Sequence, residues 1–404
     1  MSKGVVLSHP TGNANVREAA LALAEAGLLE EFHTSLAFFA SFWPRSLKRR
    51  AYPLELRRYT RGHPFRESFR LGATRLGLGS LVRYETGWAS VDAVYRSLDR
   101  QVARAAQSRP VYCYEDGALE TFRSAERTGA AKIYDLPIGY WGAARRLLLE
   151  EAERRPEWAA TMPGLRDSEE KLARKDEELR LASGIVVAST FTKTTLAECP
   201  FPIAPVSVIP YGCDQPAQEG PSRDHRGPLR LLYVGSLSQR KGISDLFEAV
   251  QLLGNTVDLT LVGRKIGGAC SALDQALSAH RWIPSLPRKK ILDEMRRHDV
   301  LVFPSLFEGF GLVVTEALSQ GLPVITTCHT CGPDVLTDGR EGFLIPIRDP
   351  NAIVQRLETL ARDRALLFDM SSAALEKARE LSWAVYRKRL ADMVRGVLAE
   401  NHER

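Results

Sequence analysis

Two segments in the second half of the chain place charged side chains next to glycine where a loop meets a helix. Residues 235–242 read Gly-Ser-Leu-Ser-Gln-Arg-Lys-Gly, so Arg240 and Lys241 stand just before a helix expected from Ile243 to Leu253. Two cations at the positive end of a helix dipole suit a diphosphate. Because an Arg-Lys pair in an arbitrary loop is more often simply solvated, this interpretation needs support from other residues.

The second segment, residues 304–311, reads Pro-Ser-Leu-Phe-Glu-Gly-Phe-Gly and supplies the carboxylate of Glu308. Free helix amides, which can hold hydroxyls or phosphate, are expected to begin near Gly311 or Leu312. Glu316 follows Glu308 by eight positions, and a helical path of that length covers about 12 Å, the span of a nucleotide diphosphate sugar. The two carboxylates are therefore expected to hold opposite ends of one donor, although Glu316 by itself is more simply an ordinary helix residue.

Short apolar runs that end at turn residues alternate with amphipathic stretches along both halves of the chain. This is the pattern of parallel sheets covered by helices on both faces, and it starts with a strand at 4–7 and restarts with one at 229–234. The helix after the first strand is expected from about Val16 to Ala26, with Asn15 and Glu18 spaced as a capping pair. Because open α/β sheets bind ligands at the carboxyl ends of their strands, two facing sheets would enclose a cleft lined by loops from both.

The composition is that of a globular protein. The 404 residues are 44% hydrophobic and 26% charged, which excludes disordered, collagen-like and disulfide-rich classes and leaves room for two to three domains. Six cysteines show no regular framework, so we expect a reducing cytoplasm. No apolar run approaches the length of about 18 residues that a membrane span requires.

The motifs of the second half resemble one known family. They are Tyr-Val-Gly-Ser-Leu-Ser-Gln-Arg-Lys-Gly at 233–242, Phe-Pro-Ser-Leu-Phe-Glu-Gly-Phe-Gly-Leu-Val-Val-Thr-Glu-Ala-Leu at 303–318, Gly-Leu-Pro-Val-Ile at 321–325 and Asp-Gly-Arg-Glu-Gly-Phe-Leu-Ile-Pro at 338–346. Together they resemble the donor-binding half of the group 1, family 4 retaining glycosyltransferases of the GT-B fold. The likeness in the first half is weaker and rests on the loop after the first strand, on 187–192 and on 208–214.

The resemblance implies an α/β protein of the GT-B type, with two Rossmann-like domains facing each other across a cleft. Residues 1–212 would form the acceptor-side domain, with a basic, aromatic insertion at about 32–110. A linker at 213–228 would lead to the nucleotide-sugar donor domain at 229–382. Residues 383–404 would form a last helix that packs back toward the first domain.

Roles for individual residues follow from the same resemblance. Arg240 and Lys241 would neutralise the donor diphosphate as the glycosidic bond breaks. Glu308, with the backbone of Phe310 and Gly311, would hold sugar hydroxyls, whereas Glu316 would hold the nucleotide ribose. Gly235, Ser236 and Leu312 complete the donor-binding set. Retention is implied, by a same-face substitution in which the leaving phosphate helps to deprotonate the acceptor.

From the first domain, Asp116 in Tyr-Cys-Tyr-Glu-Asp-Gly at 112–117 is expected to enter the cleft after a strand and contact the donor sugar or the acceptor. Glu115 competes for this assignment, and a purely turn-forming Asp-Gly is an equally good interpretation. Gly12 and Asn13 should approach the diphosphate or the acceptor, although the family often has two adjacent glycines there.

No Asp-x-Asp pair occurs in the sequence, so the usual signal of a metal-carboxylate clamp is missing and the cationic loop is expected to replace the metal. We therefore expect no metal and no cofactor beyond the nucleoside diphosphate sugar donor. The absence of Gly-x-Gly-x-x-Gly after the first strand counts against a nicotinamide or flavin oxidoreductase.

A basic strip, residues 45–83, has eleven basic and two acidic residues and so carries a charge of 11 minus 2, or +9, in a chain of net charge +6. Its aromatic and leucine residues suggest two alternatives. The strip could lie on an anionic membrane surface and bring a lipid-linked acceptor to the cleft, which we favour, or its aromatic residues could belong to the core beneath a solvated face. No nucleic-acid motif accompanies the charge, so no nucleic-acid partner is expected.

The sequence thus predicts a metal-independent retaining glycosyltransferase that moves a hexose-like sugar from a nucleoside diphosphate to a glycan or lipid-linked acceptor. Polysaccharide or cell-envelope assembly in a cytoplasm, with contact to the inner face of the cell membrane, is the expected setting. Two alternatives remain open: a non-catalytic protein that binds sugar nucleotides or glycans, and a nucleotide-sugar epimerase of the same architecture. An epimerase would convert the donor without any acceptor.

Overall fold

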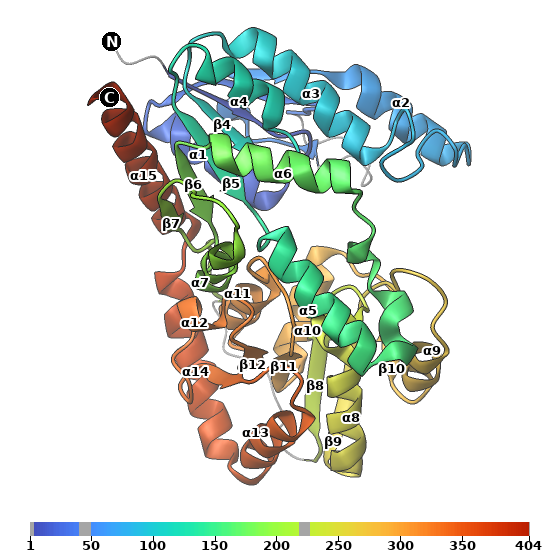
Figure 1. Cartoon of the computed structure of the whole chain (residues 1–404). Helices are drawn as coiled ribbons and strands as arrows, with labels where there is room; N and C mark the ends of the chain where they lie inside the picture. The colour runs from blue at the N-terminus through green and yellow to red at the C-terminus, as the bar shows by residue number, and fades with distance from the viewer. Residues whose placement is uncertain (1–3, 40–49, 218–226, 404) are drawn as a thin grey trace.

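The structure, a computed structural model, describes residues 4–39, 50–217 and 227–403 and divides into an upper and a lower α/β domain (Figure 1). Among the described residues, the first domain has a seven-stranded parallel sheet of order β3-β2-β1-β4-β5-β6-β7. The second has a six-stranded parallel sheet of order β10-β9-β8-β11-β12-β13. These are the two Rossmann-like sheets that the alternation of apolar and amphipathic stretches predicted.

The elements of the first domain follow one another in strand-helix order. Its strands are β1 (Val5–Ser8), β2 (Leu29–Thr34), β3 (Thr60–Gly62), β4 (Val111–Tyr114), β5 (Lys132–Leu136), β6 (Gly184–Val187) and β7 (Val206–Val208). Its helices are α1 (Ala14–Glu25), α2 (Pro64–Arg75), α3 (Val91–Ala106), α4 (Leu119–Glu126), α5 (Trp141–Arg154), α6 (Glu169–Leu181) and α7 (Thr190–Thr195). Strands β1, β4, β5 and β6 are buried over their whole length, because helices cover both faces of a parallel sheet.

The second domain repeats this order. Its strands are β8 (Leu229–Val234), β9 (Val257–Val262), β10 (Arg281–Ile283), β11 (Val300–Phe303), β12 (Val324–Thr327) and β13 (Gly342–Ile345). Its helices are α8 (Ile243–Leu253), α9 (Ser271–Ser278), α10 (Arg288–Arg297), α11 (Leu312–Ser319), α12 (Gly332–Val335), α13 (Pro350–Arg362) and α14 (Arg364–Glu380). None of the helices that the structure describes is long and apolar enough to cross a membrane.

The last helix, α15 (Trp383–Glu403), leaves the second domain and packs on α1 of the first, along the left side of Figure 1. Arg387 of α15 pairs with Glu18 and with Glu25 of α1. The expected capping pair of Asn15 and Glu18 is wrong, because both residues lie inside α1, where partners from elsewhere in the fold are available. The side chain of Asn15 instead donates to the hydroxyl of Tyr211 at 3.2 Å.

The region expected to be a basic, aromatic insertion, residues 32–110, contributes to the sheet itself. Strand β3 pairs in parallel with β2 at one edge, and α3 packs against α4. Helix α2 projects from the body of the domain at the upper right of Figure 1. Part of the predicted basic strip, 45–49, lies outside the described residues.

Helix α5 and the 3-10 turn that follows it, Pro156–Thr161, dock on the second domain (Figure 1). The rings of Trp158 and Phe247 stack at a centroid distance of 6.0 Å, and Arg154 pairs with Asp245 at 2.9 Å. The fully buried carboxylate of Glu151 accepts a hydrogen bond of 2.7 Å from Gln239. These contacts hold the loops of the two domains face to face.

Candidate active site

A cleft of about 400 Å³ lies between the two domains, at the carboxyl ends of β1, β5, β8 and β11. Five predicted donor-binding residues line it: Gly235, Phe310, Gly311 and Leu312 of the second domain and Asn13 of the first. Of the four predicted catalytic residues, Lys241 and Glu308 line the cleft and Arg240 and Asp116 do not. The lining residues are Asn13, Asn15, Pro137, Ile138, Tyr211, Val234, Gly235, Lys241, Phe303, Glu308, Gly309, Phe310, Gly311, Leu312 and Val313.

Lys241 and Glu308 form the charged centre of the cleft. The ammonium of Lys241 is hydrogen-bonded to Oε2 of Glu308, and a guanidinium nitrogen of Arg240 lies 3.6 Å from the same oxygen. Lys241 also lies over the ring of Phe303, with its nitrogen 4.8 Å from the ring centre. Arg240 in addition donates to the main-chain carbonyl of Phe307. The two loops that the sequence singled out therefore converge on one carboxylate.

Burial and charge act in opposite directions on this ion pair. Burial by itself would raise the pKa of Glu308, but the charges of Lys241 and Arg240 outweigh it and lower the pKa. Burial lowers the pKa of Lys241, and the negative charge of Glu308 opposes this. An anion bound in the cleft would add a second negative partner for Lys241, so the site is suited to a diphosphate.

Glycines allow the loops of the second domain to approach their neighbours closely. A Cβ atom on Gly309 would lie 1.9 Å from the carbonyl oxygen of Pro137 in the first domain, and one on Gly242 would lie 2.0 Å from that of Pro304. Gly311 has a φ of 87° at the N-cap of α11, a left-handed conformation that favours glycine. Leu312 and Val313, the first residues of α11, line the cleft, so the free amides of the first turn lie beside it.

Glu316 lies on α11, outside the lining of the cleft. Its carboxylate accepts a hydrogen bond of 2.9 Å from Arg288, which also pairs with Asp214 of the interdomain connection. Burial raises the pKa of Glu316, and Arg288 opposes this. The helical path expected between Glu308 and Glu316 is wrong, because α11 begins only at Leu312.

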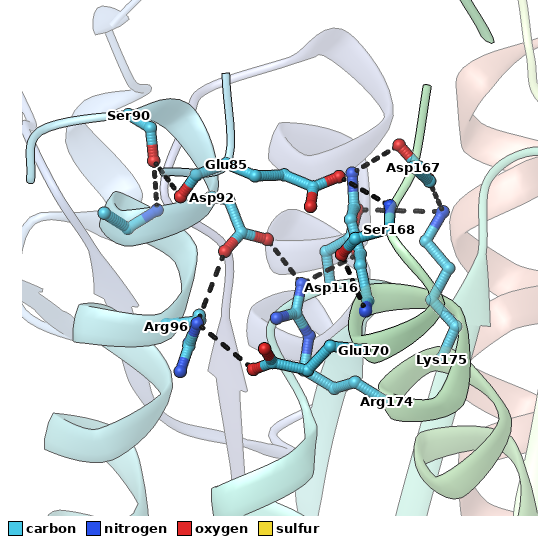
Figure 2. Close-up of polar contacts among 12 residues, drawn as sticks. Glu85, Ser90, Asp92, Arg96, Asp116, Asp167, Ser168, Glu170, Arg174 and Lys175 are labelled. Atoms are coloured by element: carbon cyan, nitrogen blue, oxygen red, sulfur yellow. Dashed lines mark hydrogen bonds and ion pairs between the residues drawn. The ribbon is translucent and has the colours of Figure 1, made fainter. Parts of the chain in front are cut away.

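Asp116 lies at the tight turn after β4, with a φ of 71°. Figure 2 shows it within a charged cluster, where Arg174 stands between Asp116 and Asp92. The distance from Arg174 to Asp116 is 3.4 Å, and Lys175 pairs with the neighbouring Glu115 at 3.5 Å. Both acidic candidates thus face cations of α6, and neither is among the residues that line the cleft.

Gly12 and Ser236 are held through their main-chain carbonyls, which accept hydrogen bonds of 2.9 Å from Arg17 and from the hydroxyl of Tyr233. They stand next to the lining residues Asn13 and Gly235 without lining the cleft themselves.

The structure adds Pro137, Ile138 and Tyr211 to the predicted set. The first two follow β5, and Tyr211 packs against Phe310 with ring centres 5.1 Å apart. They carry no charged or reactive side chain that would mark them as site residues in the sequence. The one signal available was the segment Val-Ile-Pro-Tyr-Gly at 208–212, which already contributed to the resemblance.

Comparison with known proteins agrees with this geometry. Residues 228–363 match the family model described as Glycosyl transferases group 1. The D-inositol 3-phosphate glycosyltransferase of Streptomyces avermitilis is 34% identical over 124 residues, 31% of this chain and 27% of that protein. The glycogen synthase of Mycobacterium tuberculosis is 30% identical over 184 residues, 43% of this chain and 44% of that protein. The chain thus spans less than half of the length of these relatives.

Solved structures resemble the whole chain. Sucrose-phosphate synthase from Thermosynechococcus elongatus superimposes with a TM-score of 0.66 at 17% identity, over 98% of this chain and 100% of that one. HepE from Anabaena, in complex with UDP and glucose, gives a TM-score of 0.63 at 16% identity, over 97% and 99%. The chain has the GT-B fold. Its resemblance to the group 1 glycosyltransferases is confirmed, and the matched segment covers most of the second domain.

Proposed function

We propose that this protein is a glycosyltransferase that moves a hexose-like sugar from a nucleoside diphosphate sugar to a glycan or lipid-linked acceptor, with retention of configuration and without a metal. The observation that carries the proposal is the convergence of Lys241 and Arg240 on Glu308 in a cleft between two domains. Relatives named as glycosyltransferases and a neighbour of the same fold bound to UDP and glucose support it.

The charges suggest how the site would promote transfer. As the bond between the anomeric carbon and the diphosphate breaks, negative charge collects on the phosphate oxygens, and Lys241 and Arg240 would stabilise it more than they stabilise the bound substrate. Glu308 and the amides near Gly311 would hold the sugar. Glu316, tied to Arg288, would bind the ribose end.

We also propose that α2 and the segment after it contact an anionic membrane surface. Eight of the twelve large hydrophobic side chains exposed in the described part of the chain fall between 54 and 91. Phe65 and Phe69 of α2 meet the ring of Trp88 edge-on, and Arg66 lies over that ring at 4.5 Å. Aromatic and basic side chains together on a projecting helix are typical of binding at the membrane interface.

A thermal-shift screen across UDP-, GDP- and ADP-sugars tests the main proposal, since a ligand that binds only the folded state raises its melting temperature. The donor that gives the largest shift is then incubated with the protein, and release of nucleoside diphosphate is followed with and without EDTA. We expect release that EDTA leaves unchanged. If none of the donors raises the melting temperature or is turned over, the proposed function is wrong.

A further inference from the structure

A second cavity, of about 210 Å³, lies beside the cleft and between α5, α6 and the loop at Phe307. We call it the side pocket and define it by Ile138, Trp141, Arg145, Leu148, Lys175 and Arg240, which all line it. Its volume holds on the order of seven water molecules, which corresponds to one sugar ring of an acceptor.

The side pocket and the cleft meet at two places. Ile138 lines both, and Arg240 lines the side pocket whereas the next residue, Lys241, lines the cleft. The guanidinium of Arg240 lies 3.6 Å from Glu308, which belongs to the cleft. A molecule in the side pocket would therefore face the end of the cleft where the donor sugar is expected.

The charged lining of the side pocket consists of three cations, Arg145, Lys175 and Arg240, and one carboxylate, Asp167. Asp167 is already held by Tyr84 and by Lys171, the latter at 3.0 Å. Both of these contacts are made to Oδ1, and Lys175 lies 3.3 Å from Oδ2. The other charged residues of the lining are cations.

Lys175 keeps its charge in this position. Burial by itself would lower its pKa, but the carboxylates of Glu115, Asp116 and Asp167 raise it. Its ion pairs with Asp167 and Glu115 measure 3.3 and 3.5 Å, longer than a tight charge-assisted hydrogen bond. Figure 2 shows the Lys175 side chain reaching Asp167 from α6.

Arg145 stands nearer to solvent and is weakly held. Its side chain is 49% exposed, and its partner Glu169, at 2.9 Å, is 79% exposed. Ion pairs of this kind contribute little to stability, so the guanidinium can turn to a ligand at small cost. Trp141 and Leu148 supply an apolar wall on which the C–H face of a sugar ring can pack.

We propose that the side pocket binds the acceptor, and that the acceptor is a sugar ring carrying an anionic group, a phosphate or a carboxylate, held by Arg145 and Lys175. This inference rests on the proposed function. In the transfer, the acceptor hydroxyl oxygen forms a bond to the anomeric carbon of the donor and the bond from that carbon to the diphosphate breaks. The electron pair leaves with the nucleoside diphosphate, and the hydroxyl proton passes to the departing phosphate oxygen.

The test uses the full chain and the donor found by thermal shift. Transfer is measured to glucose 6-phosphate, glucuronate and glucose, and to the corresponding galactose and mannose series, so that phosphate, carboxylate and neutral rings are compared on the same ring. We expect the anionic rings to have KM values at least tenfold below the neutral ones, and the better of the two anionic arms identifies the group. Equal or better use of neutral rings overturns the proposal, as does donor hydrolysis without transfer to any of them.

Two variants on one helix provide the matched comparison. Arg145→Ala removes a charge-assisted contact, so KM for the anionic acceptor should rise about tenfold with little change in kcat, and Arg145→Lys should restore part of the loss. Arg146→Ala, one residue along, is the control: Arg146 is 52% exposed and pairs with Glu150 and Glu198 instead. Identical KM values for the Arg145→Ala and Arg146→Ala variants overturn the proposal. If wild-type protein neither binds nor hydrolyses any donor, the proposed function itself fails.

Discussion

The hydroxyl of Ser189, in the first domain, donates a hydrogen bond of 2.7 Å to the main-chain carbonyl of Gly309, in the second. Thr192 donates to the same carbonyl at 2.9 Å, and the main-chain carbonyl of Pro137 lies so close to Gly309 that it leaves no room for a Cβ atom. This junction sets the separation of the two loops next to Glu308.

Replacing Gly309 with alanine should force the domains apart at the cleft. The new Cβ would lie 1.9 Å from the Pro137 carbonyl oxygen, so backbone must move. We expect donor turnover to fall by about a hundredfold, as misplacement near 1 Å commonly costs. Steady-state kinetics check this, with Gly396→Ala as control because a Cβ there meets nothing within 4 Å. Equal rates for the two variants would refute the role of the junction.

Lys241→Met should lower kcat for donor turnover by roughly a hundredfold to a thousandfold, the usual cost of losing one group that stabilises developing charge. Lys290→Met, on an exposed side chain of α10 that pairs only with Asp293 at 3.7 Å among the described residues, provides the control. Circular dichroism should show that both variants remain folded. A Lys241→Met enzyme with near-normal kcat would contradict the assignment of Lys241.

Glu316→Gln should weaken donor binding, because a neutral amide would hold both the ribose hydroxyls and Arg288 less strongly than the carboxylate does. We expect the dissociation constant of the donor to rise about tenfold in calorimetry. Glu358→Gln removes a carboxylate that pairs with the exposed Arg362 on α13 and should change nothing. Unaltered donor affinity in Glu316→Gln would place the ribose elsewhere.

The buried carboxyl group of Asp135 should make the stability of the protein fall as pH rises. Burial raises the pKa of Asp135 to about 7, against a hydrogen bond of 2.6 Å from Tyr112 that lowers it. Between about pH 4 and 7 the unfolded chain therefore loses this proton while the folded chain keeps it, so stability falls as pH rises. Urea unfolding across this range should show wild-type protein losing on the order of 4 kcal/mol relative to Asp135→Asn. A constant difference between the two proteins would show that the group does not titrate there.

The membrane proposal predicts that the protein floats with anionic vesicles and does not float with neutral ones. Arg75→Glu/Arg83→Glu should abolish flotation, since each basic residue near an anionic surface contributes about 1 kcal/mol. Both arginines are exposed, and neither forms an ion pair with a described carboxylate. Lys388→Glu/Arg389→Glu, on exposed positions of α15, is the control of equal charge. Flotation that ignores lipid charge would remove the proposal.

Much of the second domain could be predicted from local pattern. Strand β8 was expected at 229–234 and α8 from Ile243 to Leu253, and both have these bounds. Short apolar strands bounded by glycine and proline carry their own start and stop signals, so these boundaries need no knowledge of the rest of the fold. The convergence of Arg240 and Lys241 on Glu308 could likewise be inferred, because both loops follow strands of one parallel sheet.

The first domain was harder to predict, because several of its elements and contacts depend on partners that are distant in the sequence. Strand β3 has only three residues, two of them exposed, and it forms by pairing with β2 rather than by its own pattern. Asn15 and Glu18 have the spacing of a capping pair, yet their partners, Tyr211 and Arg387, lie nearly 200 and more than 360 positions away. The residues next to Asn15 and Glu18 in the sequence do not predict these contacts.

The sequence by itself determined which groups carry charge, which glycines permit close approach, and that two parallel sheets would present their loops to one another. Only the tertiary structure decided that Asp116 faces the cations of α6, that Glu316 binds Arg288, and that Arg240 and Lys241 line separate cavities. Spacing along the chain fixes the order of side chains on an element. Their direction depends on the packing of elements distant in sequence, and that packing is decided only when the whole core forms.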